Sequence, residues 1–479
     1  MVRITGQFVF ASGVAFSTRP RIAGKIDRVN VRSALFLLAL PLCAQLPDAA
    51  RARLAEAANL AAGGQSPKAE EILTTLSRSY PRNAEIRHTL GLVLLRAKKH
   101  VAARRELEAA ATLDAKSPLI RLALAQARLE TGSKAEAMRA AAEALRLAPS
   151  EPVVAHALAM FYSQAGEFSK AAEQETRWAR ANPTDRLALL RTAEYHLRAN
   201  EAEAAIQLAG EVAAAGPSAP AQSILGKAYR LKRDPPKAVA ALQEAIRLEP
   251  AQPAYVADLA QLFLDHNTPE PARMLLDQAM TRFPGDVELR RMLGLACYAI
   301  GNTERALDEF LRVTEMEPDS ALSYAALESL LPDAGNRLDL VVGKFRTFAE
   351  RHPKNPVAHY LLAMGVATRD GATAETEALL RRAIATDSGF WPAWFELHTV
   401  LKAQDRFDEA AKALEQTLKL NPDHAAAHYS LAQIYSRLED TARAAEHRQK
   451  HHQLVLRDRE ETDRKRREMP RLAYEVRKG

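Results

Sequence analysis

Small and apolar residues recur along this chain at intervals of three and four positions, in short stretches separated by polar turns. The stretch Ala238, Leu242 and Ala245, followed by Pro250, is a representative example. Residues spaced in this way lie on one face of an α-helix, so each stretch predicts a short helix with a single apolar face. The proline ends the helix because it disfavours helical geometry at the residue before it. The pattern predicts an all-α protein.

The helical pattern repeats with a period close to 34 residues. Prolines that end a repeat follow one another at spacings of 68, 34, 34, 33, 34, 34, 35 and 69 residues. An alanine column stands about twelve residues before these prolines, and alanines outside it, such as Ala219, are expected to be exposed. The column contains Ala69, Ala103, Ala137, Ala171, Ala205, Ala238, Ala272, Ala306, Ala410 and Ala444. A period of this length predicts stacked helical hairpins, with the small residue where the two helices approach most closely.

Glycine or asparagine recurs fifteen residues into many repeats. At this point the first helix must end in a left-handed residue, which glycine tolerates and asparagine accepts. The residues concerned are Gly64, Gly132, Gly166, Gly301, Asn200 and Asn267.

The segment Leu225-Gly226-x-x-Tyr229, continued by Ala238 and Pro250, resembles the signature of the tetratricopeptide repeat family. The resemblance extends over about residues 50–458, some 85% of the chain. It implies a right-handed superhelical solenoid of about twelve helix-turn-helix hairpins. It also implies a non-catalytic scaffold that binds a peptide or a helical segment of another protein in a concave groove.

The repeats divide the chain into an array of about eight hairpins over 50–318, two degenerate repeats over 319–390 and two further repeats over 391–458. In the degenerate part, residues 330–336 are expected to break the first helix early. Either Val341 or Leu340 replaces the column alanine, and Thr376 replaces it one repeat later. These two repeats are either degenerate units without a special role or a flexible joint between the two arrays.

The amino-terminal 44 residues do not follow the repeat. Residues 31–44 combine a basic start, an apolar run of nine residues and a small residue before Gln45, which together predict a secretory signal peptide. The apolar run is too short to span a bilayer. Residues 1–30 fit neither a leader nor a repeat; they are either a real extension or a non-native one upstream of a start at Val31. We therefore expect an exported bacterial protein, periplasmic or secreted. A lipoprotein acylated at Cys43 is disfavoured by Leu42.

The balance of charged residues argues against binding to nucleic acid. The formal net charge is +7, but residues 1–44 hold six basic residues and one acidic residue. The remaining 60 basic and 58 acidic residues nearly balance, so the body carries no basic footprint for a phosphate backbone. The charged tail, residues 459–479, is the one segment where contact with a membrane surface is considered.

The sequence contains no recognisable catalytic or cofactor-binding motif. A phosphate-binding loop, a Gly-x-Ser-x-Gly elbow, a Cys-x-x-Cys pair and a His-Glu-x-x-His motif are all missing. We therefore expect no enzyme activity and no cofactor. Cys297 falls at a buried helix position and is interpreted as a structural thiol. Four histidines in the last repeat (His424, His428, His447 and His451) raise the alternative of a metal-binding carrier, although partly exposed polar residues are the favoured interpretation.

By register, the inner face of the array includes five candidate partner-binding residues: Arg291, Tyr298, Tyr360, Phe395 and Tyr429. Aromatic and arginine side chains are the usual anchors of protein interfaces. A second hypothesis is an envelope assembly factor that serves pili, exopolysaccharide export or outer-membrane biogenesis. The sequence identifies neither the partner nor the oligomeric state.

Overall fold

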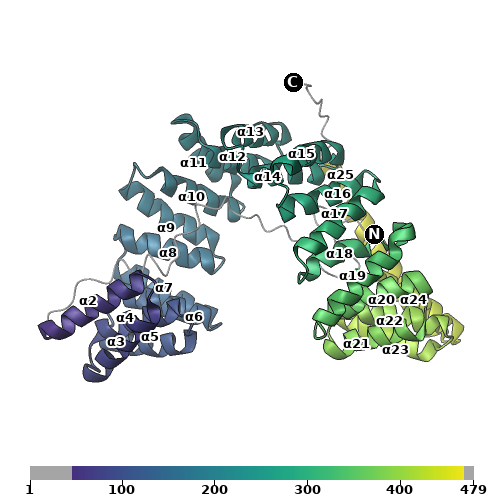
Figure 1. The fold of residues 1–479 in the computed structure, drawn as a ribbon, viewed down its shortest axis with the longest axis horizontal. Helices are drawn as coiled ribbons and strands as arrows, with labels where there is room; N and C mark the ends of the chain where they lie inside the picture. The colour runs from purple at the N-terminus through teal and green to yellow at the C-terminus, as the bar shows by residue number, and fades with distance from the viewer. Residues whose placement is uncertain (1–45, 469–479) are drawn as a thin grey trace. The chain divides into compact units, whose positions relative to one another are not determined.

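The computed structural model describes residues 46–468, and within these residues it is built from helices joined by short turns (Figure 1). They form two compact parts, residues 46–250 and 251–468, which we describe separately. The boundary falls at Pro250 and Ala251, outside the degenerate repeats 319–390. The expected extension (1–30), the signal peptide (31–44) and residues 469–479 of the charged tail lie outside the described residues.

The amino-terminal part contains six antiparallel hairpins. They are α2 (Asp48–Ala62) with α3 (Ser66–Ser79), α4 (Ala84–Arg96) with α5 (His100–Leu113), α6 (Pro118–Glu130) with α7 (Lys134–Leu147), α8 (Pro152–Gln164) with α9 (Phe168–Ala181), α10 (Arg186–Arg198) with α11 (Ala202–Ala214), and α12 (Ala219–Leu231) with α13 (Pro235–Leu248).

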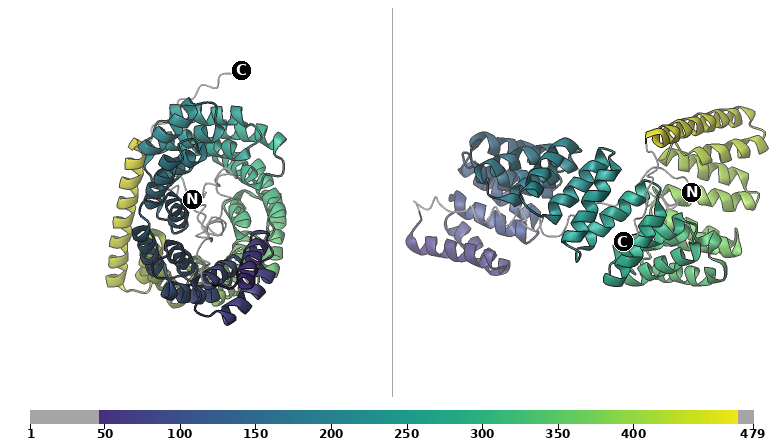
Figure 2. Two further views of the ribbon diagram at one scale, coloured as in Figure 1. Left: turned by 90° about the vertical axis from the view of Figure 1, so that its left-hand side faces the viewer. Right: turned by 90° about the horizontal axis from the view of Figure 1, so that it is seen from above.

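The carboxy-terminal part also contains six hairpins. They are α14 (Pro253–Asp265) with α15 (Pro269–Arg282), α16 (Val287–Ala299) with α17 (Thr303–Met316), α18 (Ala321–Glu328) with α19 (Leu338–Arg351), α20 (Pro356–Asp370) with α21 (Ala374–Thr386), α22 (Trp391–Ala403) with α23 (Phe407–Leu420), and α24 (Ala425–Arg437) with α25 (Thr441–Glu468). Figure 2 shows the antiparallel helices of each part from two more sides, with α25 as a long rod. The twelve hairpins confirm the predicted solenoid of stacked helical units.

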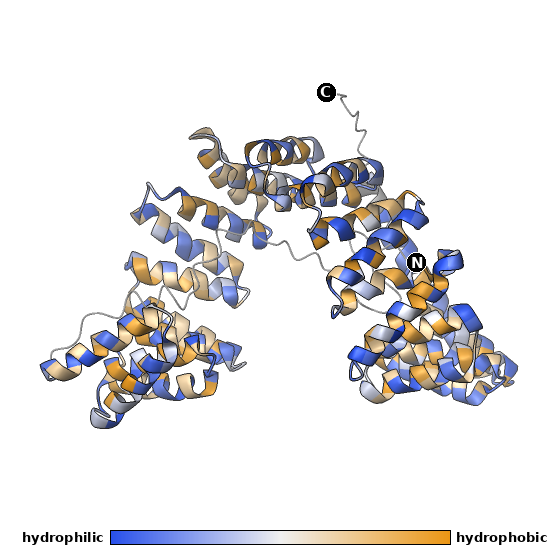
Figure 3. Cartoon of the chain, in the orientation of Figure 1, coloured by the Kyte–Doolittle hydropathy of each residue, from blue (hydrophilic) through white to orange (hydrophobic). Residues whose placement is uncertain are grey.

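The alanine column lies where the two helices of each hairpin meet. All ten alanines predicted for this column are fully buried. Gly226, in the facing helix, approaches the same place so closely that an added Cβ would stand 2.5 Å from Cγ of Leu242 and 3.2 Å from the carbonyl oxygen of Ala238. Hydrophobic residues gather on the faces that meet neighbouring helices, as the mixed colours around each helix in Figure 3 indicate. Ala219, expected to be exposed, is buried at the start of α12, a helix that packs against α11 and α13.

The predicted left-handed residues are confirmed at every position named from the sequence, with φ between 55° and 83°. The same turn also holds Lys98, Arg233, Asp405 and Glu439 at positive φ, and the sequence rule did not find these. At Lys98, the N–H of Lys99 donates to the carbonyl of Leu94 at 2.9 Å, as the N–H of Gln65 donates to that of Leu60 at 2.8 Å after Gly64. The hydrogen bonds that end the helix are thus kept, and glycine is preferred there without being required.

The degenerate repeat 319–355 departs from the others as expected. Its first helix, α18, stops at Glu328, and two short 3₁₀ turns, η2 (Leu331–Asp333) and η3 (Gly335–Arg337), lead into α19. Val341 takes the place of the column alanine and is fully buried, whereas Leu340 is exposed. One repeat later Thr376 fills the column, and its hydroxyl donates to the carbonyl oxygen of Gly371 at 3.0 Å.

Candidate functional site

The first helices of the last two complete hairpins, α22 and α24, present an exposed surface with matching residues. Counted from the start of each helix, the fifth and ninth residues are Phe395 and Thr399 on α22, and Tyr429 and Gln433 on α24. All four are exposed except Phe395, which is half-buried. Lys402, one turn further along α22, bridges the two helices, because its Nζ donates to Oε1 of Gln433 at 3.2 Å. We call these five residues the α22–α24 face.

Aromatic and imidazole rings form a cluster next to this face. The ring of His424 lies 4.5 Å from that of Phe395 and 5.0 Å from that of Trp391, measured between centroids. The ring of Tyr429 lies 5.2 Å from that of His451, yet Tyr429 remains 50% exposed. A large aromatic side chain that packs against a neighbouring ring and is half open to solvent is suited to contact a partner.

The other three predicted anchors are placed differently. Tyr360 is fully buried, and its hydroxyl donates to Oε1 of Glu328 at 2.7 Å. Arg291 is 7% exposed and pairs with Glu288 and, at 2.9 Å, with Glu317. Both side chains are engaged within the fold, so their interpretation as contact residues for a partner is wrong in this conformation. Tyr298 is half-buried and remains a candidate.

The register alone did not distinguish these cases. Arg291, Tyr360, Phe395 and Tyr429 are all the fifth residue of the first helix of their hairpins. Tyr360 is covered by Glu328 of α18, which accepts its hydroxyl hydrogen, and by the ring of Phe390, which packs 5.6 Å away. Exposure at the fifth position therefore depends on the neighbouring hairpin.

A pair of carboxyl groups lies between α18, α20 and α22. Glu328 accepts the hydroxyl hydrogen of Tyr360, and Glu396 follows Phe395 on α22. Burial, and then the nearby charge of Glu328, raise the pKa of Glu396 to about 7. Glu396 therefore carries a reduced negative charge at neutral pH.

The four histidines of the last repeat do not converge. Nδ1 of His428 lies 2.8 Å from Nδ1 of His447. Nδ1 of His424 instead accepts the N–H of Ala427 at 3.0 Å, capping α24, and Nδ1 of His451 lies 3.0 Å from the carbonyl oxygen of Ala425.

His428 and His447 bring two ring nitrogens together, whereas zinc sites in proteins use three or four protein ligands. Between residues 46 and 468, no group of three or more His, Cys, Asp or Glu side chains is arranged to hold a metal. The structure therefore does not bring the four histidines together as one metal site.

In the amino-terminal part, a buried ion network joins α8, α9 and α10. Glu175 is fully buried, and its two oxygens lie 2.8 Å from Nδ1 of His156 and 2.7 Å from Nε of Arg191. Arg191 also approaches Asp185, which accepts the indole N–H of Trp178 at 3.2 Å. Glu175 thus joins two hairpins, because it pairs with His156 of its own hairpin and with Arg191 of the next one. Cys297 is fully buried, and desolvation raises the pKa of its thiol to about 11, which confirms the structural interpretation.

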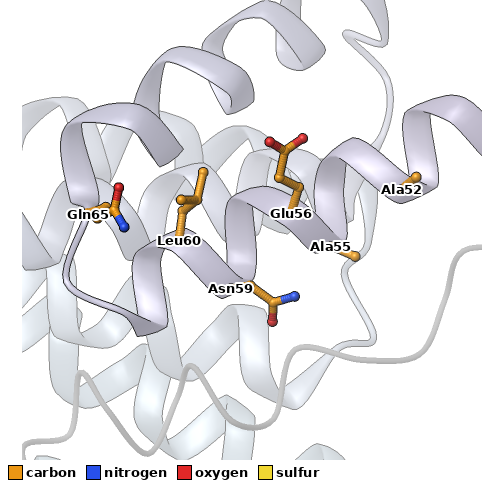
Figure 4. A pocket seen from close by; sticks show the side chains of 6 residues that line it. All are labelled: Ala52, Ala55, Glu56, Asn59, Leu60 and Gln65. Atoms are coloured by element: carbon orange, nitrogen blue, oxygen red, sulfur yellow. The ribbon is translucent and has the colours of Figure 1, made fainter.

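An open cavity of about 500 Å³ lies along α2 (Figure 4). It is lined by Ala52, Ala55, Glu56, Asn59, Leu60 and Gln65. Five of these six side chains carry no ionisable group, and Glu56 is the one titratable residue of the lining. Among the described residues, no helix is both long and apolar enough to cross a membrane.

Several solved structures resemble this one at low sequence identity. Yeast Tom70 is 16% identical, with 81% of this chain and 97% of that chain covered and a TM-score of 0.39. The Cut9–Hcn1 hetero-tetramer of APC/C is 13% identical, with 88% and 95% covered and a TM-score of 0.36. A tetratricopeptide repeat protein from Parabacteroides merdae is 17% identical, with 51% and 97% covered and a TM-score of 0.40. No curated protein matches.

Family models connect the sequence to its repeat directly. One tetratricopeptide repeat model matches residues 54–118, 225–286 and 398–450, and a second matches residues 264–331. These ranges lie in both compact parts and follow the hairpins of the structure. The alanine column and the left-handed turns continue the same unit between them. The chain belongs to the tetratricopeptide repeat family.

Proposed function

We propose that this protein is a non-catalytic scaffold that binds a peptide or helical segment of a partner protein along the first helices of its repeats, which line the concave groove of a tetratricopeptide superhelix. Proteins of this family typically act as scaffolds and generally bind other proteins. The observation that carries the proposal is the α22–α24 face, where Tyr429 is half exposed beside the ring of His451. Aromatic anchors of this kind contribute most of the binding energy in many interfaces.

The proposal is tested by truncating the two aromatic residues of this face. Phe395→Ala with Tyr429→Ala should weaken capture of the partner by about thirtyfold for each true anchor, or about 2 kcal/mol. Capture is measured by affinity purification with mass spectrometry, and helical content by circular dichroism.

A matched control is Lys412→Ala with Lys419→Ala, since both lysines are exposed on the second helix α23. Glu377 and Glu415 are unsuitable controls, because Glu377 pairs with Arg406 and Glu415 accepts the hydroxyl of Tyr435. If the control pair abolished capture and the aromatic pair did not, the first-helix face would not be the binding surface.

We further propose that the protein is exported and acts in the periplasm or outside the cell. The support is the basic start, apolar run and small residue in residues 31–44. A scaffold with this leader suits an assembly role in the cell envelope. Sequencing the amino terminus of the mature protein should give a start at or near Gln45. A mature chain that retains residues 1–30 would contradict both the cleavage and the start at Val31.

A further inference from the structure

The α22–α24 face has a distribution of charge that restricts its partner. The five residues of the face, together with Ser436 beside them on α24, fill the fifth, ninth and twelfth positions of the two helices. Lys402 is therefore the cation among these positions, and no acidic residue is present at them. Its ammonium donates a hydrogen bond to the neutral amide oxygen of Gln433. A lysine ammonium has three N–H donors, so two of them remain to donate hydrogen bonds to a carboxylate.

Charged groups around the face are compensated. Arg437 lies over the ring of Phe407 at 4.5 Å and 3.8 Å from Asp405, so it points towards the start of α23. Asp423 pairs with Arg457 at 2.9 Å. These pairs leave little net charge beside Lys402.

Ionisable groups behind the face add little charge at neutral pH. Desolvation lowers the pKa of His398 to about 4 and also lowers the pKa of His424. Both imidazoles are therefore neutral at pH 7, and Glu396, with its raised pKa, is partly protonated there. The positive charge of Lys402 thus determines the sign of the face.

The spacing between anchor and charge sets the geometry of a ligand. Phe395 and Lys402 are seven residues apart on α22, which corresponds to about 10 Å along a helix. An extended chain covers this distance in about three residues. An aromatic or aliphatic side chain against Phe395 and Tyr429 would then place a residue three positions away beside Lys402.

We infer that the α22–α24 face binds an extended segment of a partner protein in which a carboxylate lies about three residues from an aromatic or aliphatic side chain. The inference rests on the proposed function and adds the chemistry of the partner. The apolar side chain packs on the rings of Phe395 and Tyr429, and the carboxylate accepts hydrogen bonds from Nζ of Lys402. Electrostatic complementarity of this kind selects among partners and makes binding sensitive to salt.

The experiment is a peptide display selection on the full chain, followed by fluorescence polarisation with the selected peptides. Selected sequences should combine an acidic residue with an apolar residue three positions away. Lys402→Glu should reduce their affinity at least about tenfold, and a peptide with lysine in place of the acid should regain binding to this variant. Lys412→Glu, an exposed lysine on α23, is the matched control and should leave affinity unchanged. Affinity should also fall as salt rises from about 0.05 to about 0.5 M.

The outcomes separate this inference from the proposed function. If Phe395→Ala with Tyr429→Ala abolishes peptide binding but Lys402→Glu does not change it, the proposed function is supported and the inference of an acidic partner segment is refuted. Selection of basic or uncharged peptides would overturn the inference in the same way. If the aromatic pair has no effect on any selected peptide, the proposed surface itself is wrong. Binding of anionic vesicles or self-association that depends on Lys402, with no peptide selected, would replace the peptide by a lipid surface or a second copy and overturn the inference.

Discussion

Replacing Gly226 with alanine should destabilise the hairpin of α12 and α13, although alanine is the better helix former. An added Cβ would stand 2.5 Å from Cγ and 2.8 Å from Cδ2 of Leu242, and 3.2 Å from the carbonyl oxygen of Ala238. Carbon atoms pack comfortably at about 3.5–4.0 Å, so the two helices or the leucine must move by roughly 1 Å. Gly210 is the matched control, because it lies within α11 and its added Cβ would meet nothing within 4 Å.

The size of the effect follows from two opposing contributions. Glycine to alanine within a helix gains about 0.5–1 kcal/mol in both variants. Overpacking at Gly226 costs about 1–3 kcal/mol, and Gly210→Ala has no such cost. The propensity gain cancels in the comparison, so Gly226→Ala should be less stable than Gly210→Ala by about 1–3 kcal/mol.

Hydrogen exchange followed by mass spectrometry measures this difference locally, which matters because repeat arrays need not unfold in one step. Amides of α12 and α13 should exchange at least about fivefold faster in Gly226→Ala than in Gly210→Ala. Thermal unfolding of the whole chain gives a second measure. Equal protection of α12 and α13 in the two variants would refute the close approach of these helices and the repeat register built on it.

Two further variants test packing and pH dependence. Ala103→Leu should lower the free energy of unfolding in denaturant by about 1–3 kcal/mol, because Ala103 is fully buried. Ala102→Leu, on the exposed side of the same helix, should change it by less than about 0.5 kcal/mol. Equal effects of the two variants would contradict the repeat register. Desolvation lowers the pKa of His88 to about 4 from 6.5, so the unfolded chain binds its proton first and stability should fall as the pH drops from about 6.5 to about 4. His88→Leu should reduce this pH-dependent loss by on the order of 3 kcal/mol in unfolding titrations at the two pH values, and an unchanged loss would show that His88 is not held neutral.

The fold was predictable from the sequence because its determinants are local. A column alanine such as Ala306 must be small wherever two helices cross, and a residue such as Asn267 must tolerate positive φ wherever the first helix ends. The same requirements recur in each repeat, so the ten column alanines support a single repeat register. The early end of α18 was predictable for the same reason, since proline and glycine between residues 330 and 336 interrupt a helix locally.

The candidate site was only partly predictable because exposure at one position depends on the neighbouring hairpins. Tyr360 and Tyr429 occupy the same fifth position of their first helices, yet one is fully buried and the other is 50% exposed. The single-repeat pattern contains the direction of the side chain but not the residues of the neighbouring hairpins that meet it. At Tyr360, Glu328 of α18 accepts the hydroxyl hydrogen and Phe390 adds a ring contact. At Tyr429 the ring contact is with His451 of the long final helix, at 5.2 Å between centroids, and half of the residue stays exposed. The exposure of the fifth residue is thus set by the contacts that each neighbouring hairpin makes with it.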